Sequence, residues 1–258
     1  MSQVPINLKQ FTDVQNAGDI FSSMVVAHIC NDRVRSIGEA PFNGPNLIAA
    51  GSILHWADTN SVVWGTGLLW DDIELKAAPK VVLSVRGAYT WESLARRGIT
   101  SPPLFGDPGV FAPDIFPKAR TVNEVGIVPH YVDVSEELVL RAHDYGAEIL
   151  DVRSPLDDFL RRLSACRKII SSSLHGLIFA HAYGIPAVWV KLSSKVIGDG
   201  YKFFDYYSSI GYARARVPVL SANDSIPTML DYCDLPRCQI DKAALAATLR
   251  ASSEFFTV

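Results

Sequence analysis

The chain has 258 residues, with 24 Lys and Arg against 27 Asp and Glu, so its formal net charge at pH 7 is −3. This balance gives no electrostatic basis for nucleic acid as the main partner. Apolar residues make up 48% of the chain, yet no apolar run approaches the roughly 20 residues that a membrane-spanning helix needs.

The N-terminus and the cysteines indicate the compartment. Residues 1–9 lack the charged and apolar regions of a signal peptide. The cysteines form no CxxC pair, so they indicate neither a zinc site nor a disulfide scaffold and fit a reducing compartment; they are Cys30, Cys166, Cys233 and Cys238. We therefore expect a soluble cytoplasmic protein that makes at most peripheral contact with the inner face of the membrane.

Short apolar segments alternate with helical patterns along the chain. A helix is predicted over residues 19–30, after a turn formed by Asn16 and Gly18. Residues 155–165 carry apolar side chains at the spacing of one helical face, with Ser154 as the expected N-cap. The predicted buried strands are residues 62–64, 80–85, 125–129, 147–152, 168–172 and 186–190. This alternation predicts an α/β fold with parallel sheets.

Proline and glycine cluster in residues 101–117, which predicts a loop or linker rather than regular structure. Within it, Asp107 precedes Pro108 and is expected to form a turn. We therefore expect two Rossmann-like domains, residues 1–112 and 113–258, that face each other across a cleft. The alternative is one continuous doubly wound sheet.

The most informative segment joins the end of the strand at 168–172 to a helix that begins near Leu174. Free backbone N–H groups in the first helical turn can bind an anion, and the serines of residues 171–173 add hydroxyl donors. His175 lies in the same turn, at the carboxyl end of a strand, where open α/β sheets bind ligands. The alternative is a set of helix-capping serines and a surface histidine, but the combination favours an anion-binding loop.

Arg86 is the second candidate, because it directly follows the strand at 80–85. Its planar guanidinium could bind a carboxylate or a phosphate. The alternative is a structural ion pair with Glu92 or Asp107, and spacing alone leaves both interpretations open.

Further positions could border the same cleft. Asp19 is either the N-cap of its helix or a general base on the opposite wall. Lys195, in a loop after the strand at 186–190, either adds positive charge to the cleft or is an ordinary solvated lysine. The remaining expected cleft-lining residues follow predicted strands; they are Gly51, Ser52, Gly67 and His130.

Taken in order, these segments resemble the polysaccharide pyruvyltransferase family over roughly residues 14–211. The resemblance rests on Asn16-Ala-Gly-Asp19, Gly51-Ser52, Val63-Trp-Gly-Thr-Gly67, Val85-Arg-Gly87, Gly106-Asp-Pro-Gly109, Ile127-Val-Pro-His-Tyr131, Ser172-Ser-Leu-His-Gly176 and Lys195. It implies a fold similar to GT-B glycosyltransferases, phosphoenolpyruvate as donor, and neither a metal nor an organic cofactor. The implied acceptor is an oligosaccharide, free or lipid-linked, and the implied product carries a pyruvate ketal.

The resemblance also implies roles for individual residues. It associates Arg86 with the donor and places Leu174 and His175 in the donor loop. For the reaction itself, His175 is the expected acid or base, because histidine can hold either proton state near neutral pH. Arg86 is the expected anion clamp, and Asp19 is a further candidate base. Ser172, Ser173, Leu174 and Lys195 are expected to bind the donor together with Arg86 and His175. Some family members carry arginine directly before the Leu-His pair, where this chain has Ser173, so Lys195 or the helix N-terminus is expected to supply that phosphate contact. We expect Arg86→Ala to weaken donor use without unfolding the protein.

Two other functions stay open. A nucleotide-sugar glycosyltransferase of GT-B type would need a base and diphosphate site in the second half, and residues 151–155 show no ribose-binding signature. A non-catalytic scaffold of a polysaccharide assembly complex would not need Arg86 and His175 to converge on a cleft.

Overall fold

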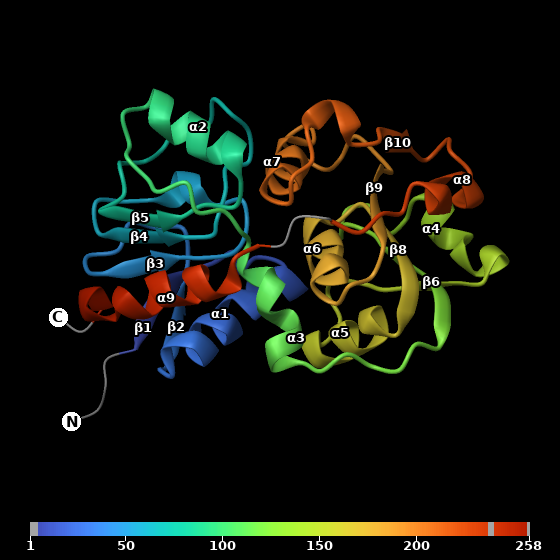
Figure 1. Ribbon diagram of the computed structural model, residues 1–258, viewed down its shortest axis with the longest axis horizontal. Coiled ribbons are helices and arrows are strands. Elements are labelled where there is room, and N and C mark those ends of the chain that lie inside the picture. Colours follow the sequence, from blue (N-terminus) through green and yellow to red (C-terminus); the bar gives the residue numbers. More distant parts are fainter. Residues whose placement is uncertain (1–4, 237–239, 257–258) are drawn as a thin grey trace.

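The computed structural model describes residues 5–236 and 240–256, which form two five-stranded parallel sheets (Figure 1). The first sheet contains β1 (Ile6–Lys9), β2 (Val34–Ile37), β3 (Asn46–Ile48), β4 (Ser61–Trp64) and β5 (Val81–Ser84). The second contains β6 (Asn123–Val128), β7 (Ala147–Ile149), β8 (Cys166–Ser171), β9 (Ala187–Lys191) and β10 (Leu220–Ser221). The expected α/β class with two Rossmann-like halves is confirmed, and a single continuous sheet is not what the described residues form.

Helices follow most of the strands, as the alternation of patterns predicts. They are α1 (Ala17–Cys30), α2 (Ala88–Arg96), α3 (Ala112–Ile115), α4 (Glu137–Leu140), α5 (Leu156–Ser164), α6 (Leu174–Ala182), α7 (Tyr201–Ser209), α8 (Ile226–Asp231) and α9 (Lys242–Ala251). Short 3₁₀ helices add η1 (Leu54–Trp56), η2 (Pro108–Phe111), η3 (Ala142–Tyr145), η4 (Arg214–Arg216) and η5 (Ser253–Phe256). The expected N-cap at Ser154 was wrong, since Pro155 occupies that position and α5 begins at Leu156.

Both sheets have the same topology. The strand order is β2-β1-β3-β4-β5 in the first sheet and, taken from its other edge, β7-β6-β8-β9-β10 in the second. In each, the order along the sheet reverses once, between β1 and β3 in the first half and between β6 and β8 in the second. Loops that leave neighbouring strands at such a reversal diverge to opposite faces of the sheet and open a crevice at the carboxyl ends of the strands. Each half therefore has one predicted ligand-binding edge.

The segment between the two sheets is more regular than its composition suggests. Residues 108–115 form η2 and α3, so the prediction that proline and glycine exclude regular structure was wrong for this part. Proline is tolerated in the first turn of a helix, where its missing N–H would have no intrahelical partner. Asp107 caps η2, because its carboxylate accepts a hydrogen bond from the Gly109 N–H at 2.9 Å.

The two halves share one hydrophobic core rather than touching through a thin interface. The largest cluster of buried apolar residues includes side chains of both sheets, and Phe21 of α1 packs edge-on against Phe179 of α6, with ring centroids 5.3 Å apart. The C-terminal helix α9 returns to the first half (Figure 1). There the Trp64 indole donates to the Leu245 carbonyl at 2.9 Å. The crevices of both halves are thereby held in a fixed relation.

Three smaller expectations concern membranes, aromatic residues and cysteines. Within residues 5–236 and 240–256, no helix has the length and apolarity to cross a bilayer. For the aromatic residues of segment 201–207 the sequence favours core packing over contact with lipid or acceptor sugar, and in α7 Phe203 stacks on Trp189 in the core at a centroid distance of 4.5 Å. Cys30, Cys166 and Cys233 are free thiols, and Cys238 lies outside the described residues.

Candidate functional site

A cavity of about 320 Å³ lies where the two crevices face each other. Segments following β1 and β3 form one wall, and segments following β6 and β8 form the other. The lining comprises Phe11, Asn16, Asp19, Gly51, Ser52, Ile53, His55 and Trp56 from the first half, His130, Tyr131, Ser173, Leu174 and His175 from the second, and Glu39, Leu69, Ile197 and Lys202. Asp19, Gly51, Ser52, His130, Ser173, Leu174 and His175, all singled out from the sequence, therefore border one space.

His175 lies in the first turn of α6 and is 8% exposed. Its ring lies directly over Gly18 of α1: a Cβ atom at that glycine would be 2.0 Å from the His175 Nδ1. The His175 Nε2 lies 3.7 Å from the Asp107 Oδ1, too far for a hydrogen bond, and has no partner among the described residues. Burial lowers the pKa of His175 although the Asp107 charge opposes this, so the ring is neutral near pH 7.

Asp19 lies opposite, in the first turn of α1, and is also 8% exposed. It is not the N-cap, because the Asn16 side chain accepts the hydrogen bond from the Gly18 N–H at 3.1 Å. Burial, followed by the charge of Asp107, raises the pKa of Asp19 to about 7, while the charge of Lys202 acts in the other direction. The carboxyl group can therefore hold or release a proton near neutral pH.

Arg86 lies beneath the cavity and is fully buried. Its Nε binds the Asp205 Oδ2 at 2.9 Å, its Nη2 donates to the Leu68 carbonyl at 2.8 Å, and its Nη1 donates to the Ser52 Oγ at 2.7 Å. Arg86 does form an ion pair, but the expected partners Glu92 and Asp107 were wrong. The carboxylate is that of Asp205, which comes from α7 of the second half. Its Nη1 also donates to the Gly51 carbonyl at 3.4 Å, so Arg86 contacts the cavity wall through Ser52 and Gly51.

Gly67 and Thr90 explain how the buried pair of Arg86 and Asp205 fits into the structure. A Cβ atom at Gly67 would lie 2.4 Å from the guanidinium carbon of Arg86, so only glycine leaves room for it there. Asp205 also accepts hydrogen bonds from the backbone N–H and the hydroxyl of Thr90, at 2.9 and 2.8 Å. Gly67 thus supports the buried pair and does not line the cavity.

Hydrogen bonds of Ser171 and Ser172 fix the loop before α6, and Ser173 of this loop lines the cavity. The Ser171 hydroxyl donates to the Val128 carbonyl at 3.0 Å, and the Ser172 hydroxyl accepts from the His130 N–H at 2.8 Å. Ser173 is the N-cap of α6, but its side chain makes no capping hydrogen bond. Ser172 therefore fixes the loop, whereas Ser173 and the first turn of α6 border the cavity.

Lys202, and not Lys195, is the lysine of this region that lines the cavity. Lys195 lies outside the cavity with 55% of its side chain exposed, and its Nζ binds the Glu136 Oε1 at 2.7 Å. Lys202, which the sequence did not single out, lies in the first turn of α7 and lines the cavity while only 8% exposed. Burial, followed by the charge of Arg86, lowers the pKa of Lys202 to about 8.

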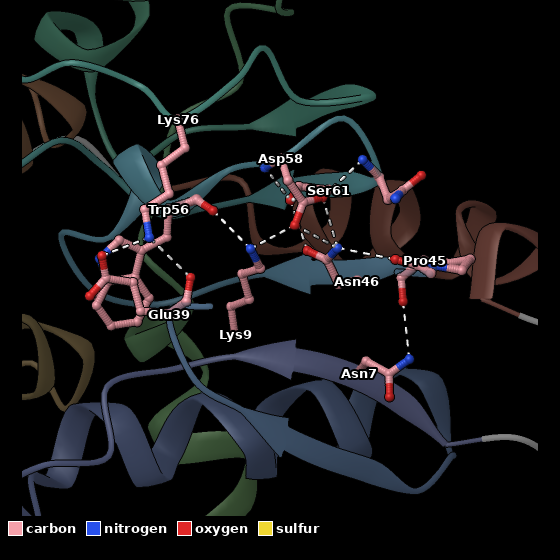
Figure 2. A network of polar contacts seen from close by, with 11 residues as sticks. Asn7, Lys9, Glu39, Pro45, Asn46, Trp56, Asp58, Ser61 and Lys76 are labelled. Carbon is pink, nitrogen blue, oxygen red and sulfur yellow. Dashed lines mark hydrogen bonds and ion pairs between the residues drawn. The ribbon is translucent and has the colours of Figure 1, made fainter. Parts of the chain in front are cut away.

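A polar network fixes the wall that η1 forms (Figure 2). Lys9 of β1 is fully buried, and its ammonium group donates to the Trp56 carbonyl at 2.8 Å and to the Asp58 Oδ2 at 2.7 Å. Lys76 binds Glu39 at 2.7 Å and, through its backbone N–H, the His55 carbonyl at 3.2 Å. The lysine–carboxylate pairs thereby hold the backbone that carries Trp56 and His55 toward the cavity.

Comparison with known proteins identifies the family. A sequence model described as polysaccharide pyruvyl transferase matches residues 57–194, more than half of the chain. The chain belongs to the polysaccharide pyruvyl transferase family. The matched segment contains Arg86, His130 and His175, whereas Asp19 and Lys202 lie on either side of it.

Two curated proteins resemble this family member over longer segments. An uncharacterized protein of Acanthamoeba polyphaga mimivirus is 31% identical over 254 residues, which cover 93% of this chain and 87% of that protein. The succinoglycan biosynthesis protein ExoV of Rhizobium meliloti is 28% identical over 184 residues, which cover 67% of this chain. The aligned part spans 57% of the length of ExoV.

Two buried residues of this family member, Asp205 and Lys202, escaped the sequence analysis, and a third, Asp107, was given another role. Asp107 was expected to form a turn or to pair with Arg86, yet it faces His175, and one of its oxygens has no hydrogen-bond partner among the described residues. Asp205 and Lys202 lie in the aromatic segment 201–207, for which core packing was preferred to a contact with lipid or acceptor sugar. Charged residues are seldom buried unless they are paired, so Lys202 and Asp205 within an otherwise apolar helix were the signal that could have identified them.

Proposed function

We propose that this chain transfers the pyruvyl group of phosphoenolpyruvate to a sugar of an exopolysaccharide repeat unit and forms a ketal there. The observation that carries the proposal is the cavity in which His175 and Asp19 face each other beside the N-terminus of α6. Membership of the polysaccharide pyruvyl transferase family supports pyruvyl transfer to a polysaccharide in general. The donor and the ketal product are our inference.

The two pKa shifts suggest which group is the base and which is the acid. His175, whose pKa burial lowers, is neutral and can accept the proton of the sugar hydroxyl that attacks C2 of the donor. Asp19, with its pKa raised to about 7, carries a proton in part of the molecules and can donate it to C3. Phosphate then leaves with the proton held by His175, and a second hydroxyl closes the ring and returns a proton to Asp19.

Other residues would position the reactants. The free N–H groups of the first turn of α6, with the Ser173 hydroxyl, form a donor set suited to the anionic donor. Arg86 would act through Ser52, which it holds at 2.7 Å, rather than by contacting the donor. Phe11 and Trp56 give the opposite wall apolar ring surface of the kind that packs against a sugar.

We also propose the wider setting that the family resemblance implies. The two halves would work as in a GT-B-like enzyme, with a boundary near residues 112 and 113 and with α9 completing the first domain. The reaction would take place in the cytoplasm, on an oligosaccharide that is free or lipid-linked at the inner face of the membrane.

The direct test is incubation with phosphoenolpyruvate and a panel of oligosaccharides. We expect phosphate release together with a mass gain of one pyruvyl group on the acceptor. The comparison arm replaces phosphoenolpyruvate with nucleotide sugars, which a glycosyltransferase would use instead. Transfer of a glycosyl group in that arm, without any use of phosphoenolpyruvate, would refute the proposal.

His175→Ala provides the matched test of the site. Loss of the general base should lower turnover by about a hundred-fold or more. Because removal of the buried ring leaves a cavity over Gly18, the melting temperature should fall, and turnover is therefore measured well below the unfolding transition of the variant. Normal turnover in the folded variant would remove His175 from the mechanism.

A further inference from the structure

Lys202 is a buried lysine without an opposite charge bound to it. It is 8% exposed, and no hydrogen bond or ion pair joins its ammonium group to any of the described residues. Its Nζ lies over the ring of the neighbouring Phe203, 5.6 Å from the ring centroid. The other buried lysine, Lys9, binds both Asp58 and the Trp56 carbonyl. A charged group is costly to bury unless it is paired, so the ammonium group of Lys202 is poised for a partner that the chain does not provide.

The surroundings of Lys202 favour an anion as that partner. The first turn of α7, which carries Lys202, and the first turn of α6 border the same cavity. The charges of Asp133 and Asp19 attract Lys202, but neither carboxylate forms an ion pair with it within the described chain. Arg86 already uses its guanidinium for Asp205, Leu68 and Ser52, so it is not free to bind an anion itself.

The chemistry of these groups fits a phosphate group better than a carboxylate. A helix N-terminus together with a lysine is a common binding arrangement for phosphate, whose oxygens accept hydrogen bonds from several directions. A carboxylate is better matched by the planar fork of arginine. We propose that Lys202 binds the phosphate group of the donor and holds it against the N-terminus of α6.

This inference rests on the proposed function, and it assigns the phosphate contact to α7 rather than to the loop that carries Lys195. Lys195 is exposed and already paired with Glu136 outside the cavity. The phosphate would lie between the first turns of α6 and α7, close to His175, as its departure from the reacting carbon requires.

The experiment measures binding of inorganic phosphate, phosphoenolpyruvate and pyruvate by titration calorimetry. The proteins are the wild type, Lys202→Met, Lys202→Arg, Lys195→Met and the control Lys191→Met, which removes an exposed lysine paired with Asp199. Lys202→Met should weaken phosphate and phosphoenolpyruvate binding by roughly thirty-fold, the loss expected for a charge-assisted hydrogen bond. Lys202→Arg should restore part of the phosphate affinity, and Lys191→Met should leave that affinity unchanged. Pyruvate binding should change far less in Lys202→Met, because pyruvate has no phosphate group.

Several results would overturn the inference. These are wild-type protein that binds no phosphate, Lys202→Met protein that binds phosphate normally, a loss of pyruvate binding equal to that of phosphate, and a loss seen in Lys195→Met instead. If phosphoenolpyruvate is used while Lys202→Met binds phosphate normally, the proposed function stands and only the assignment to Lys202 fails. If Lys202 binds phosphate but phosphoenolpyruvate supports no transfer, the anion site stands and the proposed function fails.

Discussion

Replacing Lys202 with methionine should make the protein more stable at pH 6, even though it should impair donor binding. The ammonium group is charged in the unfolded chain and must be buried without a partner in the folded one. Burial lowers the pKa of Lys202 from 10.5 to about 8. A difference of 2.5 pKa units, at 1.36 kcal/mol each, corresponds to about 3 kcal/mol of unfolding free energy lost below pH 8. Methionine has a similar length and no charge, so Lys202→Met should recover most of this energy.

The choice of pH follows from the neighbouring carboxyl group. Lys202 also lowers the pKa of Asp19, so its removal would make ionised Asp19 more costly. At pH 6, Asp19, with its pKa of about 7, is mostly protonated. It therefore contributes little to the difference in unfolding free energy between the wild type and Lys202→Met. In a chain of 258 residues, about 3 kcal/mol corresponds to a melting temperature roughly 6–12 °C higher.

The sign of the pH dependence provides a second check. Between pH 8 and 10.5 the unfolded chain binds the lysine proton and the folded chain does not, so the wild type gains stability as the pH rises. The extra unfolding free energy of Lys202→Met over the wild type should therefore fall to less than half of its pH 6 value by about pH 9.5. Urea unfolding at pH 6 and pH 9.5 measures both effects, and Lys191→Met, whose exposed pair contributes at most about 1 kcal/mol, is the control. A variant no more stable than the wild type at pH 6, or an advantage that does not depend on pH, would refute the reasoning.

The remaining predictions concern the two proposed proton-transfer groups and the buried pair beneath the cavity. Asp19→Asn should lower turnover by about a hundred-fold and remove the fall in rate above pH 7 that a wild-type pH profile should show. Gly18→Ala should lower turnover by roughly a hundred-fold, because its Cβ atom would lie 2.0 Å from the His175 Nδ1 and displace the ring; unchanged kinetics would contradict the observed packing. Arg86→Ala should lower the unfolding free energy by about 3–5 kcal/mol, because it leaves the carboxylate of Asp205 buried without its cation, and urea unfolding measures this.

The prediction for Arg86 replaces an expectation drawn from the sequence. An arginine at the end of a strand suggested a direct ligand contact that alanine could remove without unfolding the protein. The structure pairs the guanidinium with Asp205, 119 residues further along the chain, and leaves neither residue exposed. Truncation of one partner in such a pair leaves a buried, uncompensated charge, so lost activity in Arg86→Ala would not by itself identify a donor contact.

The sequence by itself determined the local elements and the family. The six strands predicted from short Val- and Ile-rich segments are present, because such residues favour buried strands whatever lies beside them. The start of α6 at Leu174 was likewise predicted, since a helix begins where an apolar strand gives way to serines and a helical pattern. Four strands were not predicted: those at 6–9 and 34–37 carry polar side chains such as Asn7, Lys9 and Arg35, and those at 46–48 and 220–221 are only three and two residues long.

Only the tertiary structure decided which residues meet in the cavity and in which charge state. His175 lies over Gly18, Arg86 binds Asp205, and Lys202 enters the cavity from a helix whose sequence indicated only a core. Helix and strand patterns depend on neighbours within a few residues, whereas these contacts join distant segments that the two matching sheet topologies bring to facing edges. The pKa values of Asp19 and Lys202 depend on how much water the surrounding chain excludes, and spacing along a sequence carries no information about that quantity.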